Sequence, residues 1–293
     1  MYRIVKKQML TPNICSMVVH APMLAAAAKP GQFLIVRTDE KGERIPLTIA
    51  DYDAAEGTVT IVTQAIGAST MHICDMAEGE CFADVVGPLG NPSDFVNWDA
   101  ERLAASHFVF LAGGVGSAPV YPQAKWLKEH GATVSVILGS RTKDLMTYEE
   151  ELRSVSHHLH VCTDDGSYGF HGNIPALLEK CVNDGEKYTE CVAIGPMIMM
   201  KFSVLMAQKL GLPVTVSLNT LMVDGTGMCG ACRVSVGGKT RFACVDGPEF
   251  DGTQVDFDEA MRRQRQYLTQ ERDAKAAYEE HEEDCACKQR GLK

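Results

Sequence analysis

Three cysteines and an aspartate in the C-terminal third of the chain carry the strongest chemical signal. Asp224 precedes Cys229 and Cys232 in the segment DGTGMCGAC, and Cys244 follows in TRFACVDG. With Asp224 standing where a first cysteine would be, the spacing is that of C-x4-C-x2-C…C, which holds a [2Fe–2S] cluster. Small residues let one tight loop point four ligands inward while its N–H groups face the cluster sulfurs. The loop therefore predicts an iron–sulfur site with these four residues as ligands.

The fourth ligand of this site has two candidates. We favour Asp224, because the loop fixes its position and a carboxylate is able to ligate ferric iron. In the alternative, Asp224 only forms a turn with Gly225, and Cys285 or Cys287 from the end of the chain completes the site. Two other interpretations of the cysteines are a tetrahedral Zn²⁺ site and packed free thiols.

A glycine-rich turn, GGVGSAP, gives the second signal. It contains Gly113, Gly114 and Gly116 and lies between the apolar segment HFVFLA and a segment with helical periodicity. Such a turn brings the backbone and the positive end of a helix close to a pyrophosphate. It predicts a dinucleotide site, with Gly195 at the end of another parallel strand. Arg141 stands where a ribose-binding acid is missing, which favours NADP; a solvated surface arginine is the alternative.

The first hundred residues contain a weaker set of candidate cofactor-binding positions. Arg44 is suited to pair with a diphosphate, and Thr48 to hydrogen-bond to the edge of a flavin ring, which makes Thr48 the candidate catalytic residue. Glycine N–H groups and small hydroxyls are suited to bind phosphates. These candidate positions are Arg44, Thr48, Gly67, Ser69 and Thr70.

The elements that must position these residues fall into successive groups along the chain. Residues 1–100 contain short strands separated by Gly and Pro turns, which predicts an antiparallel β-barrel. Residues 101–212 alternate strand and helix patterns, which predicts a doubly wound parallel α/β sheet. Residues 213–255 surround the cysteine loop and predict a small [2Fe–2S] domain. Residues 256–293 form a charged tail, expected to be a helix that needs a partner surface or to be partly disordered.

Composition and charge narrow the class of protein. The 293 residues are 45% hydrophobic and 23% charged, as in an ordinary globular chain. The net charge of -10 argues against a nucleic-acid partner. No apolar run approaches the ~20 residues of a membrane helix, and no secretory signal follows the start. We therefore expect a cytoplasmic protein with no membrane partner, in which eleven cysteines indicate metal or redox chemistry.

The remaining histidines and cysteines receive structural interpretations. Three histidines at 157, 158 and 160 lie together without an H-E-x-x-H motif, and we interpret them as a surface strand edge rather than a metal site. Most other cysteines are expected to be small buried apolar residues. These are Cys15, Cys74, Cys81, Cys162, Cys181 and Cys191.

Barrel, dinucleotide sheet and cysteine loop, in that order, resemble the ferredoxin–NADP⁺ reductase superfamily. The segments ERIPLTIAD, GGVGSAP and D-x4-C-x2-C look closest to the small (alpha) subunits of NADH-dependent reduced ferredoxin:NADP⁺ oxidoreductases, also called sulfide dehydrogenase subunit beta. The resemblance extends to about Gly252. It implies FAD in the barrel, NAD(H) rather than NADP on the sheet, and a [2Fe–2S] cluster that accepts Asp as fourth ligand. It also implies that Pro46 and Leu47 are FAD positions, together with Thr48, Gly67, Ser69 and Thr70.

The resemblance also implies an activity. It is that of an oxidoreductase subunit that passes electrons between NAD(P)H, FAD and the cluster to a larger subunit carrying FAD and [4Fe–4S] clusters. The resulting heterodimer couples NADH, NADPH and ferredoxin; electron bifurcation is a property that this chain alone does not reveal. The tail from Asp256 would then be a docking element.

Two departures from the superfamily's patterns concern hydride transfer. Arg44 stands one place earlier than in R-x-Y-S, with no tyrosine to stack on the flavin, and Ile194 replaces the cysteine of C-G-P-x-x-M. Two alternative functions follow from the same residues. One is the electron-transfer subunit of dihydroorotate dehydrogenase, which differs in its partner; the other is a zinc-stabilised binding protein without redox activity.

Overall fold

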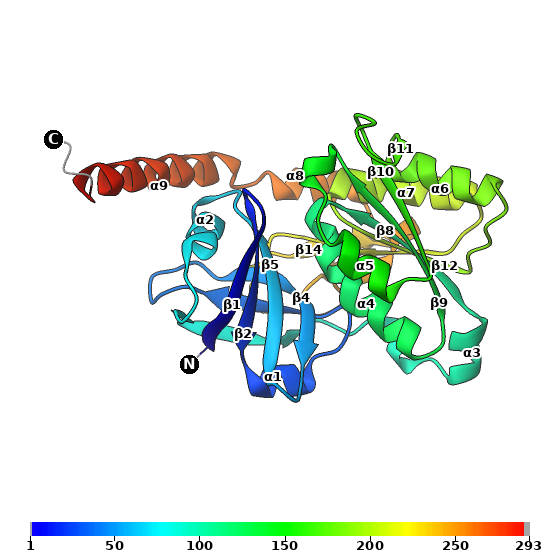
Figure 1. Ribbon diagram of the computed structural model, residues 1–293, viewed down its shortest axis with the longest axis horizontal. Helices are drawn as coiled ribbons and strands as arrows, with labels where there is room; N and C mark the ends of the chain where they lie inside the picture. Colours follow the sequence, from blue (N-terminus) through cyan, green and yellow to red (C-terminus); the bar gives the residue numbers. More distant parts are fainter. Residues whose placement is uncertain (1, 290–293) are drawn as a thin grey trace.

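The computed structural model describes residues 2–289 of the chain, with side chains described for residues 2–280. Two seven-stranded sheets stand side by side, and a two-stranded hairpin lies beside them (Figure 1). Among the described residues, no helix is both long and apolar enough to cross a membrane.

The first sheet is the predicted antiparallel barrel, with strand order β6-β1-β2-β5-β4-β3-β7. Its strands alternate in burial as a sheet wrapped around a core requires. In β2, for example, Cys15, Met17 and Val19 point into the barrel core. The elements of this part are β1 (Tyr2–Thr11), β2 (Ile14–His20), α1 (Pro22–Ala27), β3 (Phe33–Arg37), β4 (Ile45–Asp53), β5 (Thr58–Gln64), α2 (Ala68–Asp75), β6 (Cys81–Phe82) and β7 (Asp84–Leu89).

The second sheet is parallel apart from its last strand, with order β11-β10-β9-β8-β12-β13-β16. Helices cover both faces, so its central strands are buried runs rather than alternating ones. Its elements are α3 (Ala100–Ala105), β8 (His107–Gly113), α4 (Ser117–Glu129), β9 (Thr133–Ser140), α5 (Glu149–Val155), β10 (His158–Thr163), β11 (Phe170–His171), α6 (Ile174–Asn183), β12 (Glu190–Ile194), α7 (Met197–Lys209), β13 (Val214–Ser217) and β16 (Glu249–Asp251).

Strand β8 divides the α/β core into two halves. Phe108 and Phe110 face α4 and α5, whereas Val109 and Leu111 face α6 and α7. The first half also contains Ile14, Ala50 and Val62 of the barrel. Barrel and parallel sheet share one apolar core through α4. The facing edges of these two sheets are therefore held at a fixed distance and orientation.

The cysteine segment leaves the parallel sheet after β13 and returns to it as β16. Between them lies the hairpin of β14 (Arg233–Val236) and β15 (Lys239–Phe242). The tail then forms α8 (Phe257–Gln264), capped by Asp256, whose Oδ1 accepts the Glu259 N–H at 2.9 Å.

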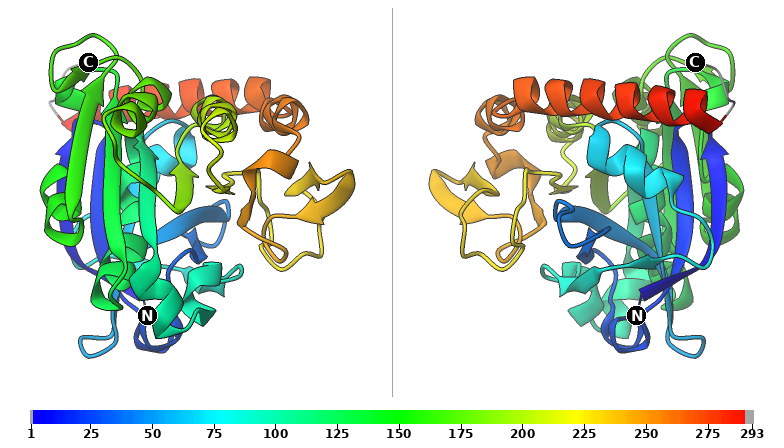
Figure 2. Two further views of the ribbon diagram at one scale, coloured as in Figure 1. Left: turned by 90° about the vertical axis from the view of Figure 1, so that its right-hand side faces the viewer. Right: turned by 90° about the vertical axis from the view of Figure 1, so that its left-hand side faces the viewer.

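The last helix, α9 (Leu268–Gln289), extends past the barrel and away from the α/β sheet (Figures 1 and 2). Its contact with the barrel is made at α2. The Tyr278 hydroxyl donates to Asp75 Oδ2 at 2.7 Å, and its ring lies 6.3 Å from that of His72. The charged tail is therefore helical, and its contacts with α2 hold it against the barrel.

Candidate functional site

The cysteine loop brings its predicted ligands to one place. Cys232 and Cys244 are both buried, with their Sγ atoms 3.2 Å apart, whereas Cys229 is exposed. The carboxylate of Asp224 closes the loop: Oδ1 accepts the Thr226 N–H at 2.7 Å and Oδ2 the Cys229 N–H at 2.9 Å.

The protonation states of the loop suit a metal centre. The N–H groups of Thr226 and Cys229 lower the pKa of Asp224, so this carboxylate is ionised at neutral pH. Burial and the neighbouring Cys232 thiol raise the pKa of Cys244 to about 12. Thiols become ligands as thiolates, so a metal binding here displaces their protons.

The sulfur atoms of the loop also accept backbone N–H groups. The Ala231 N–H points to Cys229 Sγ and the Cys244 N–H to Cys232 Sγ, each at 3.5 Å. Donors of this kind surround iron–sulfur clusters, so the donor set and its surroundings fit such a group. The side chains of the alternative ligands, Cys285 and Cys287, lie outside the described residues.

Two contacts fix the loop against the barrel. Gly225 has a φ of +77°, and a Cβ there would lie 2.6 Å from Ile35 Cδ1 and 2.9 Å from Leu89 Cδ1. The positive φ favours glycine at this turn, and any larger residue would also displace the ends of two side chains of β3 and β7. Arg44 reaches across from the barrel, where Nε donates to Val223 O at 3.2 Å and an Nη donates to Asp224 O at 3.3 Å. Arg44 thus contacts the cysteine loop and does not line the cleft described below, and its expected role at a diphosphate stays a prediction.

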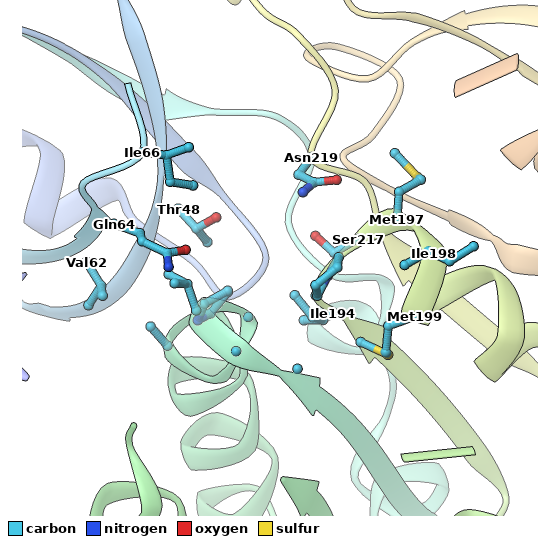
Figure 3. A pocket seen from close by; sticks show the side chains of 18 of the residues that line it. Thr48, Val62, Gln64, Ile66, Ile194, Met197, Ile198, Met199, Ser217 and Asn219 are labelled. Carbon is cyan, nitrogen blue, oxygen red and sulfur yellow. The ribbon is translucent and has the colours of Figure 1, made fainter. Parts of the chain in front are cut away.

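A cleft of about 1060 Å³ separates the barrel from the carboxyl edge of the parallel sheet. Figure 3 shows side chains of β4, β5 and the following loop, such as Thr48 and Gln64, facing those of β12, α7 and the segment after β13, such as Ile194 and Asn219. Clefts of this kind at the ends of parallel strands are where open α/β sheets bind ligands.

The predicted glycine turn forms one wall of this cleft. Gly113, Gly114 and Gly116 line it, and no side chain caps the first turn of α4. A Cβ on Gly116 would lie 2.4 Å from Ile194 O, so the turn can approach β12 only with glycine at this position. The N-terminus of α4 therefore lies at the cleft, where a pyrophosphate site requires it.

The predicted barrel residues separate into two groups. Four of them line the cleft, namely Pro46, Leu47, Thr48 and Thr70. The side chain of Ser69 instead donates to Glu43, and the Gly67 N–H donates to Thr70 Oγ1 at 3.0 Å. Gly67 and Ser69 therefore shape the start of α2 beside the cleft without lining it.

The sheet supplies the other two predicted residues. Arg141 and Gly195 line the cleft at the ends of β9 and β12, on either side of the glycine turn. Ile194, which replaces the cysteine of the superfamily pattern, also faces the cleft (Figure 3). An apolar residue thus occupies the position from which a thiol would point.

Several polar lining residues were missed from the sequence. Gln64 ends β5, Ser217 ends β13, and Asn219 follows β13. The Thr220 hydroxyl is buried at the cleft and has no hydrogen-bond partner among the described residues. The carboxyl end of β13 was a usable signal, whereas nothing in the local sequence marked Gln64. An orphaned hydroxyl at a cleft wall fits a polar ligand.

Comparisons with known proteins match this arrangement. The profile described as the iron–sulfur cluster binding domain of dihydroorotate dehydrogenase B matches residues 219–256. An uncharacterized protein of Clostridium beijerinckii is 59% identical over 281 residues, covering 96% of this chain and 95% of that protein. A dihydroorotate dehydrogenase B (NAD⁺) electron transfer subunit homolog of Thermotoga maritima is 46% identical, covering 92% of each. The chain belongs to the dihydroorotate dehydrogenase B electron transfer subunit family.

A solved structure extends the likeness of this family member to three dimensions. It is a structure of the NADH-dependent reduced ferredoxin-NADP oxidoreductase, with 44% identity and a TM-score of 0.88 over 95% of this chain and 98% of that one. A ferredoxin NADP⁺ reductase from Neisseria gonorrhoeae, 16% identical with a TM-score of 0.55 over 72% of this chain and 90% of that one, shares the fold. Barrel and α/β sheet are thus the ferredoxin reductase-like architecture, and the domain that binds an iron–sulfur cluster follows them.

Proposed function

We propose that the chain is an electron-transfer flavoprotein subunit that passes electrons between NAD(P)H, FAD and a [2Fe–2S] cluster to a larger subunit. One observation carries the proposal: the cysteine loop packs on the barrel strands that continue into the wall of the cleft. Phe33 and Ile35 of β3 share a small core with Cys232 and Cys244, and Phe33 also lines the cleft. When bound, FAD accepts a hydride from a nicotinamide and the cluster carries single electrons.

The barrel wall supplies the proposed FAD site. Pro46 and Leu47 offer apolar surface to a flavin, and the Thr48 hydroxyl offers a hydrogen bond to its edge. Thr70 and the start of α2, with Gly67 and Ser69, lie where small polar groups can hold phosphates. The rigid barrel fixes these groups, so the chain's role is to hold and orient rather than to transfer protons.

The α/β wall supplies the proposed nicotinamide site. Gly113, Gly114 and Gly116 bring the α4 N-terminus to a pyrophosphate. Gly195 lets the end of β12 approach Gly113, because a Cβ there would lie 3.0 Å from Gly113 O and 2.4 Å from Met199 Cε. Arg141 borders the position of the adenosine ribose. We propose NAD(H) as the favoured dinucleotide, because the structurally similar oxidoreductase is named NADH-dependent.

Asp224, Cys229, Cys232 and Cys244 are the proposed cluster ligands. Arg44 and Gly225 then act as positioning residues that hold the loop against the barrel. The division into a barrel over 1–100, an α/β unit over 101–212, a cluster unit over 213–255 and a tail over 256–293 is part of the same proposal.

The proposed partner is a large subunit with FAD and [4Fe–4S] clusters, through which ferredoxin exchanges electrons. The family name describes a subunit, and α9 extends away from the α/β sheet, where it is able to dock a second chain. A dihydroorotate dehydrogenase partner is the second candidate, favoured by the names of curated relatives 30% identical to this chain.

An anaerobic visible spectrum of the purified chain, before and after one equivalent of NADH, tests the function. Flavin bands and a broad iron–sulfur shoulder that NADH bleaches are expected, and an equal amount of NADPH should bleach them more slowly. Folded, zinc-loaded protein without either chromophore would overturn the redox proposal in favour of the binding protein. Co-purification with a dihydroorotate-oxidising subunit would identify the second candidate.

A further inference from the structure

Three side chains with metal-ligating atoms converge at the end of the parallel sheet opposite the cleft. His160 lies on β10, Cys181 on the last turn of α6, and Glu186 in the connection from α6 to β12. One ligating atom from each lies within 4.8 Å of the other two. Segments distant in the sequence therefore present an imidazole, a thiol and a carboxylate to one point.

The site is separate from the electron-transfer machinery. His160 and Cys162 lie two residues apart on β10 and face the same side of the sheet, toward α6. Cys162 lines the cleft, as does Ile174 at the start of α6. Cys181 follows Ile174 by seven residues, about 10 Å along a helix. A ligand at Cys181 thus lies beyond the cleft, and the inference does not rest on the proposed function.

The contact between His160 and Glu186 has an unusual geometry. His160 Nε2 lies 3.0 Å from Glu186 Oε1, within ion-pair distance. The same nitrogen is buried and makes no hydrogen bond to any described residue, so its direction misses the oxygen. Two ligands bonded at 2.0–2.2 Å to one tetrahedral zinc are about 3.3–3.6 Å apart and point at the metal rather than at each other. The observed separation is a few tenths of an ångström shorter, so a small movement of either side chain would admit a metal ion between the two atoms.

Neighbouring groups orient Glu186 and shield Cys181 from water. The Tyr188 hydroxyl donates to Glu186 Oε2 at 2.6 Å, which holds the carboxylate and leaves Oε1 for the site. Second contacts of this kind orient ligands in metal centres. The Cys181 side chain is 4% exposed and Tyr188 is 7% exposed, so the thiol side of the site is shielded from water.

We propose that His160, Cys181 and Glu186 bind one Zn²⁺ ion, with water as the fourth ligand. A mixed sulfur, nitrogen and oxygen donor set suits zinc better than calcium or magnesium, which take oxygen. A thiolate and a carboxylate balance the charge of the ion, and binding releases the thiol proton to solvent. The ion ties β10 to the connection between α6 and β12.

Zinc-buffered dialysis of the full chain, purified with its iron, tests the site. One zinc per chain by elemental analysis, in addition to the iron, is the expected result. Cys181→Ser and Glu186→Gln should each weaken binding at least roughly tenfold. His158→Ala removes an exposed histidine from the same strand and should leave binding unchanged. Glu186→Gln keeps an acceptor for the Tyr188 hydroxyl. This variant therefore tests zinc binding at the site even if Cys181→Ser fails to fold.

X-ray absorption at the zinc edge identifies the ligands. One sulfur near ~2.3 Å with nitrogen and oxygen ligands is expected. A shell of three or four sulfurs would place the zinc in the cysteine loop and overturn the proposal. Absence of bound zinc at micromolar free metal, or equal binding by wild type and both variants, would overturn it as well.

Discussion

The cysteine loop and the cleft are both functional sites, but they are built in opposite ways. The proposed cluster ligands all lie between Asp224 and Cys244, so their spacing along the chain already describes their geometry. The cleft draws its walls from residues as distant as Asn13 and Gln264, which only the fold brings together. A site confined to one loop is therefore visible in a sequence, whereas a cleft between two sheets is visible only where a motif marks one of its walls.

Removing a ligand should abolish the local site and leave the distributed one intact. Cys244→Ala takes away a buried thiol that touches Cys232, so we expect complete loss of cluster absorbance with unchanged flavin content. The matched control is Cys191→Ala, which removes a buried thiol from β12. Visible spectra and iron analysis measure both variants. Loss of the cluster from the control alone would contradict the assignment.

Substitutions of Asp224 test which residue is the fourth ligand of the cluster. If it is the fourth ligand, Asp224→Ala should lose the cluster and Asp224→Cys should keep it with an altered spectrum. If a tail cysteine is the ligand, Asp224→Ala should keep the cluster, because the carboxylate then only accepts the Thr226 and Cys229 N–H groups.

A buried carboxyl group, that of Glu249, lies where the chain returns from the cysteine loop to the parallel sheet. Glu249 of β16 accepts the Ser93 hydroxyl at 2.9 Å and the Gln123 amide at 3.0 Å, and burial raises its pKa to about 7. Unfolded, it titrates near 4.5. Between these values the unfolded chain loses the proton and the folded chain keeps it, so the group's contribution to stability falls as pH rises through 7.

Glu249→Gln should remove this penalty. The amide keeps an oxygen for Ser93 and Gln123, so the variant should match wild type near pH 4 and exceed it by about 3 kcal/mol at pH 8. Denaturant unfolding across this pH range measures the difference. Parallel stability curves for the two proteins would show that Glu249 is not the titrating group.

Sequence reasoning predicted the architecture because each part has its own periodicity. Alternating burial in β2 and the continuous apolar run of β8 distinguish a barrel from a covered parallel sheet. It did not predict that β13 and β16, which flank the cysteine loop, would belong to the parallel sheet. Strand pairing across such a sequence distance leaves no local pattern. For the same reason, the sequence did not mark Gln64 as a cleft residue or Cys181 and Glu186 as neighbours of His160.

A substitution in the glycine turn, which forms one wall of the cleft, should change the cleft and leave the cluster unchanged. In Gly116→Ala the new Cβ would lie 2.4 Å from Ile194 O, so the turn must move. A displacement of this order should lower kcat/KM for NADH by tenfold to about a hundredfold with the cluster spectrum unchanged. Gly131→Ala is the control, since it strains a positive φ at a turn with no atom within 4 Å. Equal losses in both would mean that strain, not cleft geometry, is responsible.

The sequence predicts that Arg44 binds a diphosphate in the cleft, whereas in the structure Arg44 contacts the cysteine loop. Among these substitutions, we expect that of Arg44 to have the smallest effect. Arg44→Ala removes two hydrogen bonds from a charged group to the carbonyls of Val223 and Asp224. For a half-buried side chain we expect a cost of about 1 kcal/mol, or about fivefold faster loss of the cluster to an iron chelator, with FAD affinity unchanged. Arg37→Ala, which breaks the barrel pair with Asp84, is the control and should change neither. Weakened FAD binding with an unchanged cluster would instead support the diphosphate role that the sequence predicts for Arg44.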